Sequence, residues 1–405
     1  MESKNFEVTC AIPRTGRTFE NFLNKLKTFG VNADEIDTIL EVSKKSKSMS
    51  NVDFLEASKF LQDTVQKMPC FGLSVDRKRL NRPYRVGFLG YEWTIDGICT
   101  RIEGEEPHNG SSLISLDEVD CAVVGLDELL TMTQYYLRDP TIVTKWGMYN
   151  YNLDSEKTTR TRIAGSAQLT RYNSVLGQEV QDMVGFFLIS KPKSLRQNSF
   201  KKLEQKYPFD FLAHLSEHGR RIFVKGRYAG IVRAAYPNLK ISSVEENVED
   251  EVLQAEPGSV GLEIVQTGNT LKRKGLILHG SPLFLSESLY VVDYYRYLRN
   301  KPLQKFLQNI VKPVGYFDEE RIKQFALWYL ALEKNLGDSW VHKPPITELF
   351  CDSQDPKNGL RPYRLQTRHW KPDDVYKQDE AMILLRDSKS KLQDYYREYI
   401  LSTGA

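Results

Sequence analysis

The chain has no long apolar run, and this absence bears on where the protein works. No stretch approaches the roughly 18 consecutive apolar residues of a membrane-spanning helix. Near the N-terminus, Glu2, Lys4 and Glu7 stand where a secretory signal would need an unbroken apolar segment. We therefore expect a soluble, cytoplasmic protein with no membrane partner.

Cysteine is also scarce. The five cysteines are an odd number, are scattered, and include no CxxC pair: Cys10, Cys70, Cys99, Cys121 and Cys351. Neither disulfides nor a structural zinc site is expected from this pattern. Cys10 and Cys121 lie in apolar, strand-like runs, which favours buried small side chains over nucleophiles.

Histidine is no more clustered than cysteine, with one exception. His214 and His218 are spaced i and i+4, which would indicate a metal pair only if carboxylates of the HExxH type accompanied them. The residues between them are Leu215, Ser216 and Glu217, so we expect no metal bound by the protein itself.

A strong charge imbalance is missing too. Lys and Arg number 56 against 53 Asp and Glu, which gives a formal net charge of +3. This balance argues against a protein that coats nucleic acid or an anionic membrane, because such proteins carry a clear excess of positive charge. Any anion site must therefore be local.

What the chain does contain is material for more than one core. It has 405 residues, of which 40% are hydrophobic, and this length exceeds what a single hydrophobic core usually organises. The opening segment predicts a strand at 8–12, a break at 13–16 and an amphipathic helix at 19–29. Further strands are expected at 84–89 and 120–124, with a helix at 54–65 between the first two strands. This alternation predicts an α/β fold.

A second α/β block begins at 183–189, an apolar run typical of a strand buried on both faces. More strands are expected at 221–224, 239–242, 260–265 and 289–292, with a helix at 228–236. Residues 145–180 show no clear period and are interpreted as an insertion. Beyond residue 300 the pattern becomes helical, with a last charged helix expected near 374–398.

The segment at 260–271 carries the clearest chemistry. An apolar strand with Glu263 near its end is followed by the turn Thr267-Gly268-Asn269-Thr270. Backbone N–H groups of such a turn, together with two threonine hydroxyls, suit a phosphate monoester. Glu263 can accept hydrogen bonds from both hydroxyls of a ribose, so acid and loop together fit a ribose 5-phosphate. A tight turn with an N-cap threonine remains the alternative interpretation.

This loop, VQTGNTLKRKGL, resembles the phosphoribosyl-pyrophosphate loop of ATP phosphoribosyltransferase, the first enzyme of histidine biosynthesis. Three further segments are similar to that family in the same order: CAIPRTGR at 10–17, VDCAVVGLDEL at 119–129 and GSPLFLSESLYVVD at 280–293. The resemblance covers roughly residues 7–293 and marks the chain as a divergent relative.

The resemblance implies a two-lobed α/β fold like that of type II periplasmic binding proteins. The first lobe would hold residues 1–180 and 280–300, the second 181–279, and a mostly helical extension of unknown role 301–405. The two substrates would meet in the cleft between the lobes.

Site residues follow from the same resemblance. Thr267, Gly268, Asn269 and Thr270 would bind the 5-phosphate of phosphoribosyl pyrophosphate, and Glu263 the ribose. Gly16 and Arg17 would contact the polyphosphate of one substrate, and Gly125 and Asp127 would line the facing lobe. Lys225 and Arg227, which do not match the family pattern, are expected to bind substrate through their positive charge. Among these, Glu263 and Arg17 are the residues expected to act in catalysis.

The implied reaction is transfer of the phosphoribosyl group to a nitrogen of ATP, or of another base, with release of pyrophosphate. Mg²⁺ would be bound through the substrate pyrophosphate. Positioning and electrostatics dominate such a transfer, which agrees with the lack of a convincing Ser/His/Asp or Cys/His set. We also expect a homo-oligomer and no nucleic-acid partner.

Departures from the family pattern keep other interpretations open. Glu263 stands where the family has Asp, and Thr15 stands where it has a basic residue, which Arg14 would replace. The turn after the strand expected at 221–224 is Lys225-Gly226-Arg227-Tyr228, where the family has a polar TEYP-type turn, and this change adds two positive charges where a substrate would sit. A non-catalytic protein that senses a phosphorylated metabolite is therefore the alternative. A secreted solute-binding protein is a third reading, which the missing signal disfavours.

Overall fold

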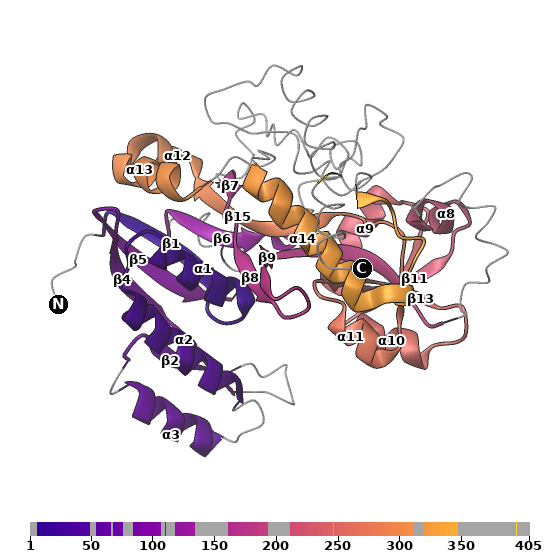
Figure 1. Cartoon of the computed structure of the whole chain (residues 1–405), viewed down its shortest axis with the longest axis horizontal. Coiled ribbons are helices and arrows are strands. Elements are labelled where there is room, and N and C mark those ends of the chain that lie inside the picture. The colour runs from indigo at the N-terminus through magenta and orange to yellow at the C-terminus, as the bar shows by residue number, and fades with distance from the viewer. Residues whose placement is uncertain are drawn as a thin grey trace. The chain divides into compact units, whose positions relative to one another are not determined.

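The structure is a computed structural model with a mixed α/β fold and a large central sheet (Figure 1). It describes residues 6–48, 54–65, 68–75, 84–106, 110, 118–133, 161–192, 211–245, 247–311, 319–346 and 394. The chain divides into two compact units. Unit 1 comprises Met1–Glu128, Lys157–Leu169 and Ser288–Lys312, and unit 2 comprises Leu129–Glu156, Thr170–Glu287 and Pro313–Ala405.

Unit 1 is built mainly from the first third of the chain. Its elements are β1 (Val8–Pro13), α1 (Arg17–Lys27), α2 (Ala33–Ser48), α3 (Phe54–Val65), β2 (Phe71–Val75), β3 (Tyr84–Phe88), β4 (Gly90–Ile95), β5 (Ile98–Glu105), β6 (Cys121–Gly125), the start of α5 (Leu126–Thr133), β7 (Thr161–Ser166), most of β15 (Leu285–Asp293), α12 (Tyr294–Arg299) and α13 (Lys301–Ile310).

The sheet of unit 1 has the order β4-β5-β1-β6-β15-β7. β1 is parallel to both of its neighbours, β5 and β6, as Figure 1 shows at the centre of this unit. β15 is antiparallel to β6 and to β7. The central strands are buried, because helices pack against them and leave little room for polar side chains.

The core of unit 1 joins distant parts of the chain. The apolar face of α1, spaced at 3.6 residues, buries Phe19, Phe22, Leu23 and Leu26. In the same core lie four side chains of α13, namely Leu303, Phe306, Leu307 and Ile310.

Unit 2 is built from the middle of the chain and from α14. Its elements are β8 (Thr170–Asn173), β9 (Gln178–Gln181), β10 (Met183–Ser190), α8 (Phe211–Glu217), β11 (Arg221–Lys225), α9 (Ala229–Ala235), β12 (Lys240–Val244), α10 (Val248–Gln254), β13 (Val260–Val265), α11 (Asn269–Lys274), β14 (Ile277–His279), the first residues of β15, α14 (Glu319–Leu336) and β16 (Trp340–Val341).

The sheet of unit 2 has the order β12-β11-β13-β10-β14-β16. β11 is parallel to β12 and β13, β10 is antiparallel to β13, and β14 is antiparallel to β10. Five strands repeat the order and relative directions of unit 1: β11 corresponds to β1, β12 to β5, β13 to β6, β10 to β15 and β14 to β7, while β4 and β16 have no counterpart.

The described residues after 300 differ from the predicted helical extension. α13 belongs to the core of unit 1, whereas α14 buries Ile322, Phe325 and Trp328 in the core of unit 2. β16 pairs with β14 and adds a strand to the sheet of unit 2. Residues 301–311 and 319–346 therefore complete the two cores, which their helical period alone could not reveal. The helix expected near 374–398 lies outside the described residues, apart from residue 394.

The boundaries predicted for the insertion and for the two lobes also differ from those in the structure. The described part of the predicted 145–180 insertion forms β7, β8 and β9, of which β7 is a strand of the unit 1 sheet. Residues 170–180, expected in the first lobe, fall in unit 2, and β15 rather than residue 280 marks the return to unit 1. The predicted strands of both α/β blocks are confirmed at β1, β3, β6, β10, β11, β12, β13 and β15.

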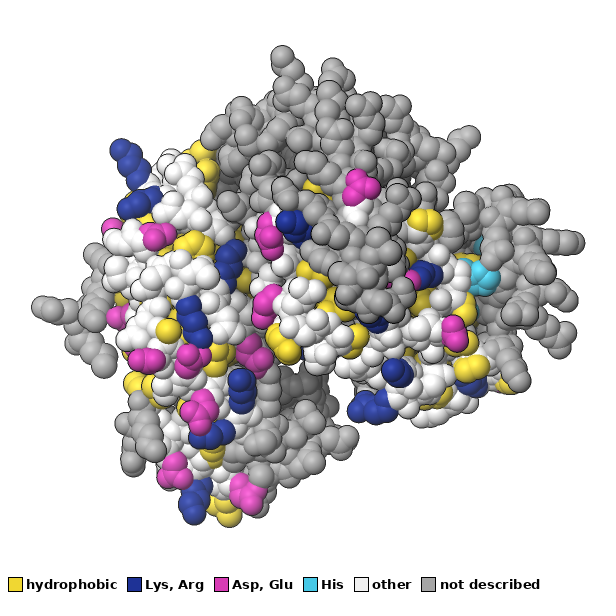
Figure 2. All heavy atoms as spheres, in the orientation of Figure 1, with side chains coloured by type: hydrophobic (Ala, Val, Ile, Leu, Met, Phe, Trp, Pro, Cys, Tyr) yellow, Lys and Arg dark blue, Asp and Glu magenta, His cyan; other side chains and the backbone are white. Residues whose placement is uncertain are grey.

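Charged side chains of both signs alternate over the molecular face drawn in Figure 2. Within the described ranges, no helix combines the length and the apolar character needed to cross a bilayer.

Candidate functional site

Two adjacent parallel strands of unit 2 lead to the residues that the sequence predicts to bind phosphoribosyl pyrophosphate, which we call the candidate donor site. β11 and β13 run in register, with Phe223 opposite Gly261 and Val224 opposite Leu262. The next residues along the two strands are Lys225 and Glu263. Ligands of α/β proteins commonly bind at the carboxyl ends of parallel strands, where side chains and loop N–H groups converge.

Glu263 is the most perturbed acid at this edge. Its Oε1 accepts a hydrogen bond of 2.8 Å from the backbone N–H of Ile264. Burial, followed by the like charge of Glu249, raises the pKa of Glu263 from its ordinary 4.5 to about 7, against smaller opposing effects that include the positive charge of Lys225. At neutral pH this carboxyl group is therefore divided between its protonated and ionised forms.

A close approach of α10 creates this environment. A Cβ added to Gly261 would lie 2.4 Å from Cγ1 of Val248 and 2.7 Å from Cγ2 of Val252, so glycine is required for α10 to pack on β13 at this distance. Glu263 follows two residues later on the same face of β13. The first turn of α10, with Glu249, consequently faces its carboxyl group.

The loop that follows β13 is Thr267-Gly268-Asn269-Thr270. Gly268 is buried and left-handed (φ 75°, ψ −2°), and Asn269 and Thr270 are exposed. The N–H of Asn269 donates weakly to the Thr267 hydroxyl, at 3.4 Å. A left-handed glycine lets the chain turn sharply from the strand, so that two exposed residues stand at the edge of the sheet.

α14 holds this loop from behind. The Asn335 amide donates to the Thr267 carbonyl oxygen at 2.5 Å and to the Asn269 side-chain oxygen at 2.8 Å. A Cβ at Gly268 would lie 2.6 Å from Cδ2 of Leu336. The loop is therefore fixed in shape by a helix that sequence reasoning assigned to a separate extension.

The basic turn after β11 is a single 3-10 turn, Gly226–Tyr228. Lys225 is partly buried, while Arg227 is exposed and lies 4.6 Å from the centre of the Tyr228 ring. Tyr228 itself is almost fully buried. The ring therefore orients the Arg227 guanidinium along the surface next to the strand end.

In unit 1 the predicted residues follow the two corresponding strands. Gly16 (φ 96°, ψ −172°) precedes the first residue of α1, the exposed Arg17. Gly125 ends β6, and Asp127 lies in the first turn of α5. β1 and β6 are parallel, with Cys10 opposite Cys121, so these residues gather at one edge of the sheet.

The arginine expected to compensate for Thr15 is engaged elsewhere. Arg14 forms ion pairs with Glu105, at 3.4 Å, and Glu106, at 3.7 Å. Its side chain is only 18% exposed. Arg14 is thus neutralised by the end of β5 rather than presented to an anion.

The structure accordingly brings the predicted residues together as two groups, one per unit. The unit 2 group contains Glu263, Lys225, Arg227 and the loop 267–270. The unit 1 group contains Gly16, Arg17, Gly125 and Asp127. Each group stands at the carboxyl ends of two neighbouring parallel strands.

Sequence reasoning missed the supporting residues. Asn335 and Leu336 contact the loop from far along the chain, and nothing in the local pattern of α14 signals that contact. Glu249 lies in an acidic first turn, which is a common feature of helix starts because of the helix dipole.

The histidine pair of unit 2, for which no metal is expected from the sequence, forms a cluster with Glu217 in the structure. His214, Glu217 and His218 at the end of α8 have ligand atoms that all lie within 4.8 Å of one another. The segment His-Leu-Ser-Glu-His has the pattern HxxEH, which is the reverse of HExxH. A carboxylate therefore does accompany the two histidines, but it stands next to the second histidine instead of the first.

No family model matches the chain, and no curated protein matches it either. Among solved structures, the ATP phosphoribosyl transferase (HisG:HisZ) complex from Thermotoga maritima is similar at 12% identity and a TM-score of 0.36, over 75% of this chain and 97% of that chain. An ABC transporter from Parabacteroides distasonis is similar at 9% and 0.31, over 97% and 94%. The cysteine-binding protein from Campylobacter jejuni is similar at 10% and 0.26, over 64% and 77%. Likenesses of this strength assign neither a family nor an activity to the chain.

Proposed function

We propose that the protein is a phosphoribosyltransferase that moves the phosphoribosyl group of phosphoribosyl pyrophosphate onto a nitrogen of ATP or another base and releases pyrophosphate. One observation carries the proposal. The residues that the sequence assigns to the donor lie on the neighbouring strands β11 and β13 and on the loop that leaves β13.

The repeated strand order supports the two-lobed organisation that belongs to this proposal. In the sheet of each unit, three neighbouring strands are parallel to one another. The next strand in the sheet is antiparallel to them, and the strand beyond it is antiparallel to that one. Such a repeat is expected of two lobes with a common architecture, as in type II periplasmic binding proteins.

In the proposed donor site, the loop 267–270 holds the 5-phosphate. The hydroxyls of Thr267 and Thr270 can donate to phosphate oxygens, and the backbone turn adds N–H donors. The two hydrogen bonds from Asn335 keep the loop in one shape before the donor arrives. Less ordering is then needed on binding, which favours affinity.

Glu263 would bind the ribose hydroxyls. A carboxyl group with a pKa of about 7 is present in both forms at neutral pH, and its protonated form donates one hydrogen bond while accepting another. Glu263 is one methylene longer than the Asp of the resembling family. Its carboxyl group lies close enough to the first turn of α10 to be affected by the charge of Glu249 and the backbone of Val248.

Transfer needs charge balance rather than a covalent nucleophile. Mg²⁺ bound to the donor would neutralise the leaving pyrophosphate, and the predicted loop residues are neutral, which suits a cation carried by the substrate rather than by the protein. Lys225 and Arg227 would add positive charge near the phosphates. In unit 1, Gly16 and Arg17 would contact the polyphosphate of one substrate, and Asp127 would line that lobe.

A non-catalytic sensor of phosphorylated metabolites is the second candidate function. It is favoured by Arg14, whose ion pairs with Glu105 and Glu106 remove the basic residue that the family pattern would present in unit 1. Such a protein would retain the donor site of unit 2 and lack turnover.

The test uses the full chain with phosphoribosyl pyrophosphate, Mg²⁺ and ATP, and measures released pyrophosphate. A panel of purine, pyrimidine and azole acceptors follows if ATP is inactive. Calorimetry on the same sample separates the two functions, since binding of the donor without turnover on any acceptor supports the sensor. Light scattering on that sample tests the expected homo-oligomer.

A pair of matched variants locates the donor. Thr270→Val removes one hydroxyl from the loop and should weaken donor binding roughly 10- to 100-fold, the range for a hydrogen bond to a charged group. Thr170→Val makes the same change at an exposed position of β8 and should leave binding unaltered. Equal affinity in both variants would place the donor elsewhere.

A further inference from the structure

The cluster at the end of α8 has the composition of a transition-metal site. Two imidazoles and one carboxylate come from His214, Glu217 and His218 of unit 2. Nitrogen ligands favour Zn²⁺, Co²⁺, Ni²⁺ or Cu²⁺, whereas Mg²⁺ and Ca²⁺ prefer all-oxygen sites. None of the three residues belongs to the proposed donor site.

The helix end is locked in a way that fixes the two histidines. The backbone N–H of Arg220 donates to the Leu215 carbonyl at 2.9 Å, and that of Gly219 donates to the Ser216 carbonyl at 3.0 Å. Together with the left-handed Gly219 (φ 55°), these bonds form a Schellman motif in which His218 is the C-cap residue. This capped end keeps the side chains of His214 and His218, which are four residues apart, on the same face of α8.

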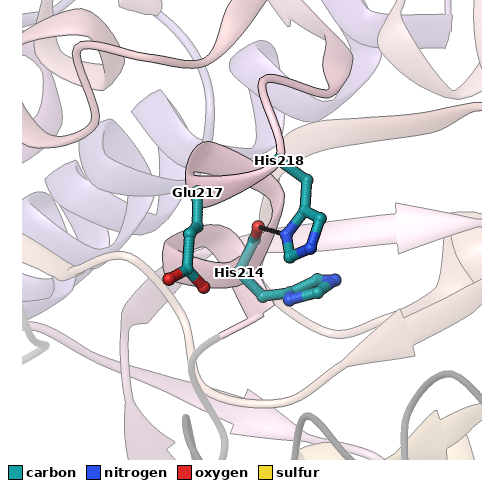
Figure 3. A group of neighbouring side chains, drawn as sticks. All are labelled: His214, Glu217 and His218. Atoms are coloured by element: carbon teal, nitrogen blue, oxygen red, sulfur yellow. Dashed lines mark hydrogen bonds between the residues drawn. The ribbon is translucent and has the colours of Figure 1, made fainter.

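A hydrogen bond sets the tautomer of His218. Its Nδ1 lies 3.1 Å from the backbone carbonyl oxygen of His214, shown as the dashed line in Figure 3. A carbonyl oxygen can only accept, so Nδ1 carries the proton and Nε2 carries the lone pair. Metal-bound histidines commonly have this arrangement, in which the second nitrogen donates to a carbonyl and orients the ring.

The geometry allows all three ligands to reach one ion. The two rings lie with centroids 4.2 Å apart, side by side in Figure 3, and the Glu217 carboxylate extends from the same turn. Donor atoms around Zn²⁺ are about 3.4 Å apart for bonds of 2.0–2.2 Å in tetrahedral geometry. The ligand atoms here lie within 4.8 Å of one another, and Glu217 and His218 are exposed, so side-chain rotation can close the remaining gap.

Electrostatics favour a cation at this position. The last turn of a helix presents carbonyl oxygens and the negative end of the helix dipole, and Glu217 adds a carboxylate. We propose that His214, Glu217 and His218 form a binding site for a divalent transition-metal ion such as Zn²⁺, with solvent completing the coordination. The bound ion would fasten the end of α8 to the turn that leads into β11.

The experiment uses the full chain without a histidine tag, stripped of metal by a chelator. Co²⁺ is titrated by its visible absorption bands, and Zn²⁺ by calorimetry and by displacement of Co²⁺. The proposal expects one ion per chain and a spectrum without a thiolate-to-cobalt band, since no cysteine takes part. Failure of the parent protein to take up either ion with this stoichiometry would overturn it.

Variants assign the ligands. His214→Ala and His218→Ala should each weaken Co²⁺ binding by more than about tenfold, because removal of even an outer-shell partner costs 10- to 100-fold. The double variant should lose the visible bands. Glu217→Gln should weaken binding to a lesser degree, while Glu256→Gln, an exposed change in the same unit, should not alter it. A double variant that binds like the parent would place the ion elsewhere and overturn the proposal.

A second measurement guards against simple misfolding. Zn²⁺ should raise the thermal midpoint of the parent protein, because a ligand that binds only the folded state stabilises it. The double variant should keep the parent's metal-free midpoint and show no rise with Zn²⁺. An equal rise in both proteins would contradict the assignment.

Discussion

The two units have the same strand order but different chemistry at the same edge. In unit 1, Arg17 is exposed after β1, and Arg14 pairs with Glu105 and Glu106. In unit 2, Glu263 has a pKa of about 7, and the loop that begins at Thr267 is fixed by Asn335. Sheet topology places the residues alike, and the helices α10 and α14, which contact Glu263 and the loop, account for the difference at the unit 2 edge.

The enclosing helices are therefore what distinguishes the candidate donor site. α10 approaches β13 through Gly261, and α14 covers the loop through Leu336. Enclosure lowers the local dielectric and strengthens each charge interaction, while an open edge stays screened by water. Substitutions at matching positions should consequently have larger effects in unit 2, or effects of opposite sign.

The largest difference is expected at the two helix-start glycines. Gly268→Ala combines left-handed backbone strain with a Cβ 2.6 Å from Leu336, for a loss of roughly 2–5 kcal/mol of unfolding free energy. Gly16→Ala meets no atom within 4 Å, and its φ of 96° alone costs about 1–3 kcal/mol. Chemical denaturation of both variants measures the difference.

A second variant tests whether Leu336 causes the larger loss of stability at Gly268. In a Leu336→Ala background the contact at Gly268 is absent, so Gly268→Ala should lower the free energy of unfolding by no more than Gly16→Ala does. An unchanged cost in that background would show that the Leu336 side chain does not constrain the loop.

The next effect concerns pH. The pKa of Glu263 is raised to about 7, so the folded state holds a proton that the unfolded state has lost above pH 4.5. This group therefore supports stability below pH 4.5 and loses that support as pH rises through 7. Glu263→Gln should be about 1–3 kcal/mol more stable than the parent at pH 8, with little difference at pH 4.5.

Denaturant titrations at the two pH values provide the measurement. Glu249→Gln serves as the matched variant, because removal of the like charge lowers the pKa of Glu263 and should recover part of the same stabilisation. A stabilisation by Glu263→Gln that is equal at pH 4.5 and pH 8 would contradict the raised pKa.

Much of the fold was predictable because its signals are local. Periodicity and punctuation located β1, α1, β6, β10, β11 and β13, and the residues that follow these strands form the candidate site. β5, although it pairs with β1 along its whole length, was missed, because two of its four inward-facing positions hold Thr100 and Gly104 rather than large apolar residues, which weakens the alternation that marks a strand.

The rest depends on contacts between distant residues. Asn335 reaches Thr267, and Glu105 pairs with Arg14, through folding that brings remote segments together. Neither partner looks unusual in its own segment, because an Asn near a helix end and a Glu at a strand end are both common on surfaces. The raised pKa of Glu263 depends on such packing in the same way, and for this reason the sequence showed the acid but not its protonation.

The hydrogen bonds from Asn335 of α14 to the loop 267–270 should also stabilise the protein. Asn335→Ala removes two hydrogen bonds to the loop and should cost about 1–2 kcal/mol. Asn309→Ala in unit 1 removes one surface hydrogen bond to Asp96, at 3.2 Å, and should stay within about 0.5 kcal/mol. Thermal or denaturant unfolding measures both, and donor binding should weaken only with Asn335→Ala. Equal costs for the two variants would argue that the loop does not rely on α14.

The smallest effect comes from making the Glu→Gln change in unit 1. Glu105 lies 3.4 Å from Arg14, and both side chains are partly exposed, so Glu105→Gln should lower stability by less than about 1 kcal/mol. Because the pair is screened by ions, the loss should shrink in high salt and vary little between pH 6 and pH 8. Glu263→Gln, in contrast, should raise stability at pH 8. The same substitution should therefore have opposite signs at the two edges, and a stabilising Glu105→Gln would mean that the edge of unit 1 is as enclosed as that of unit 2.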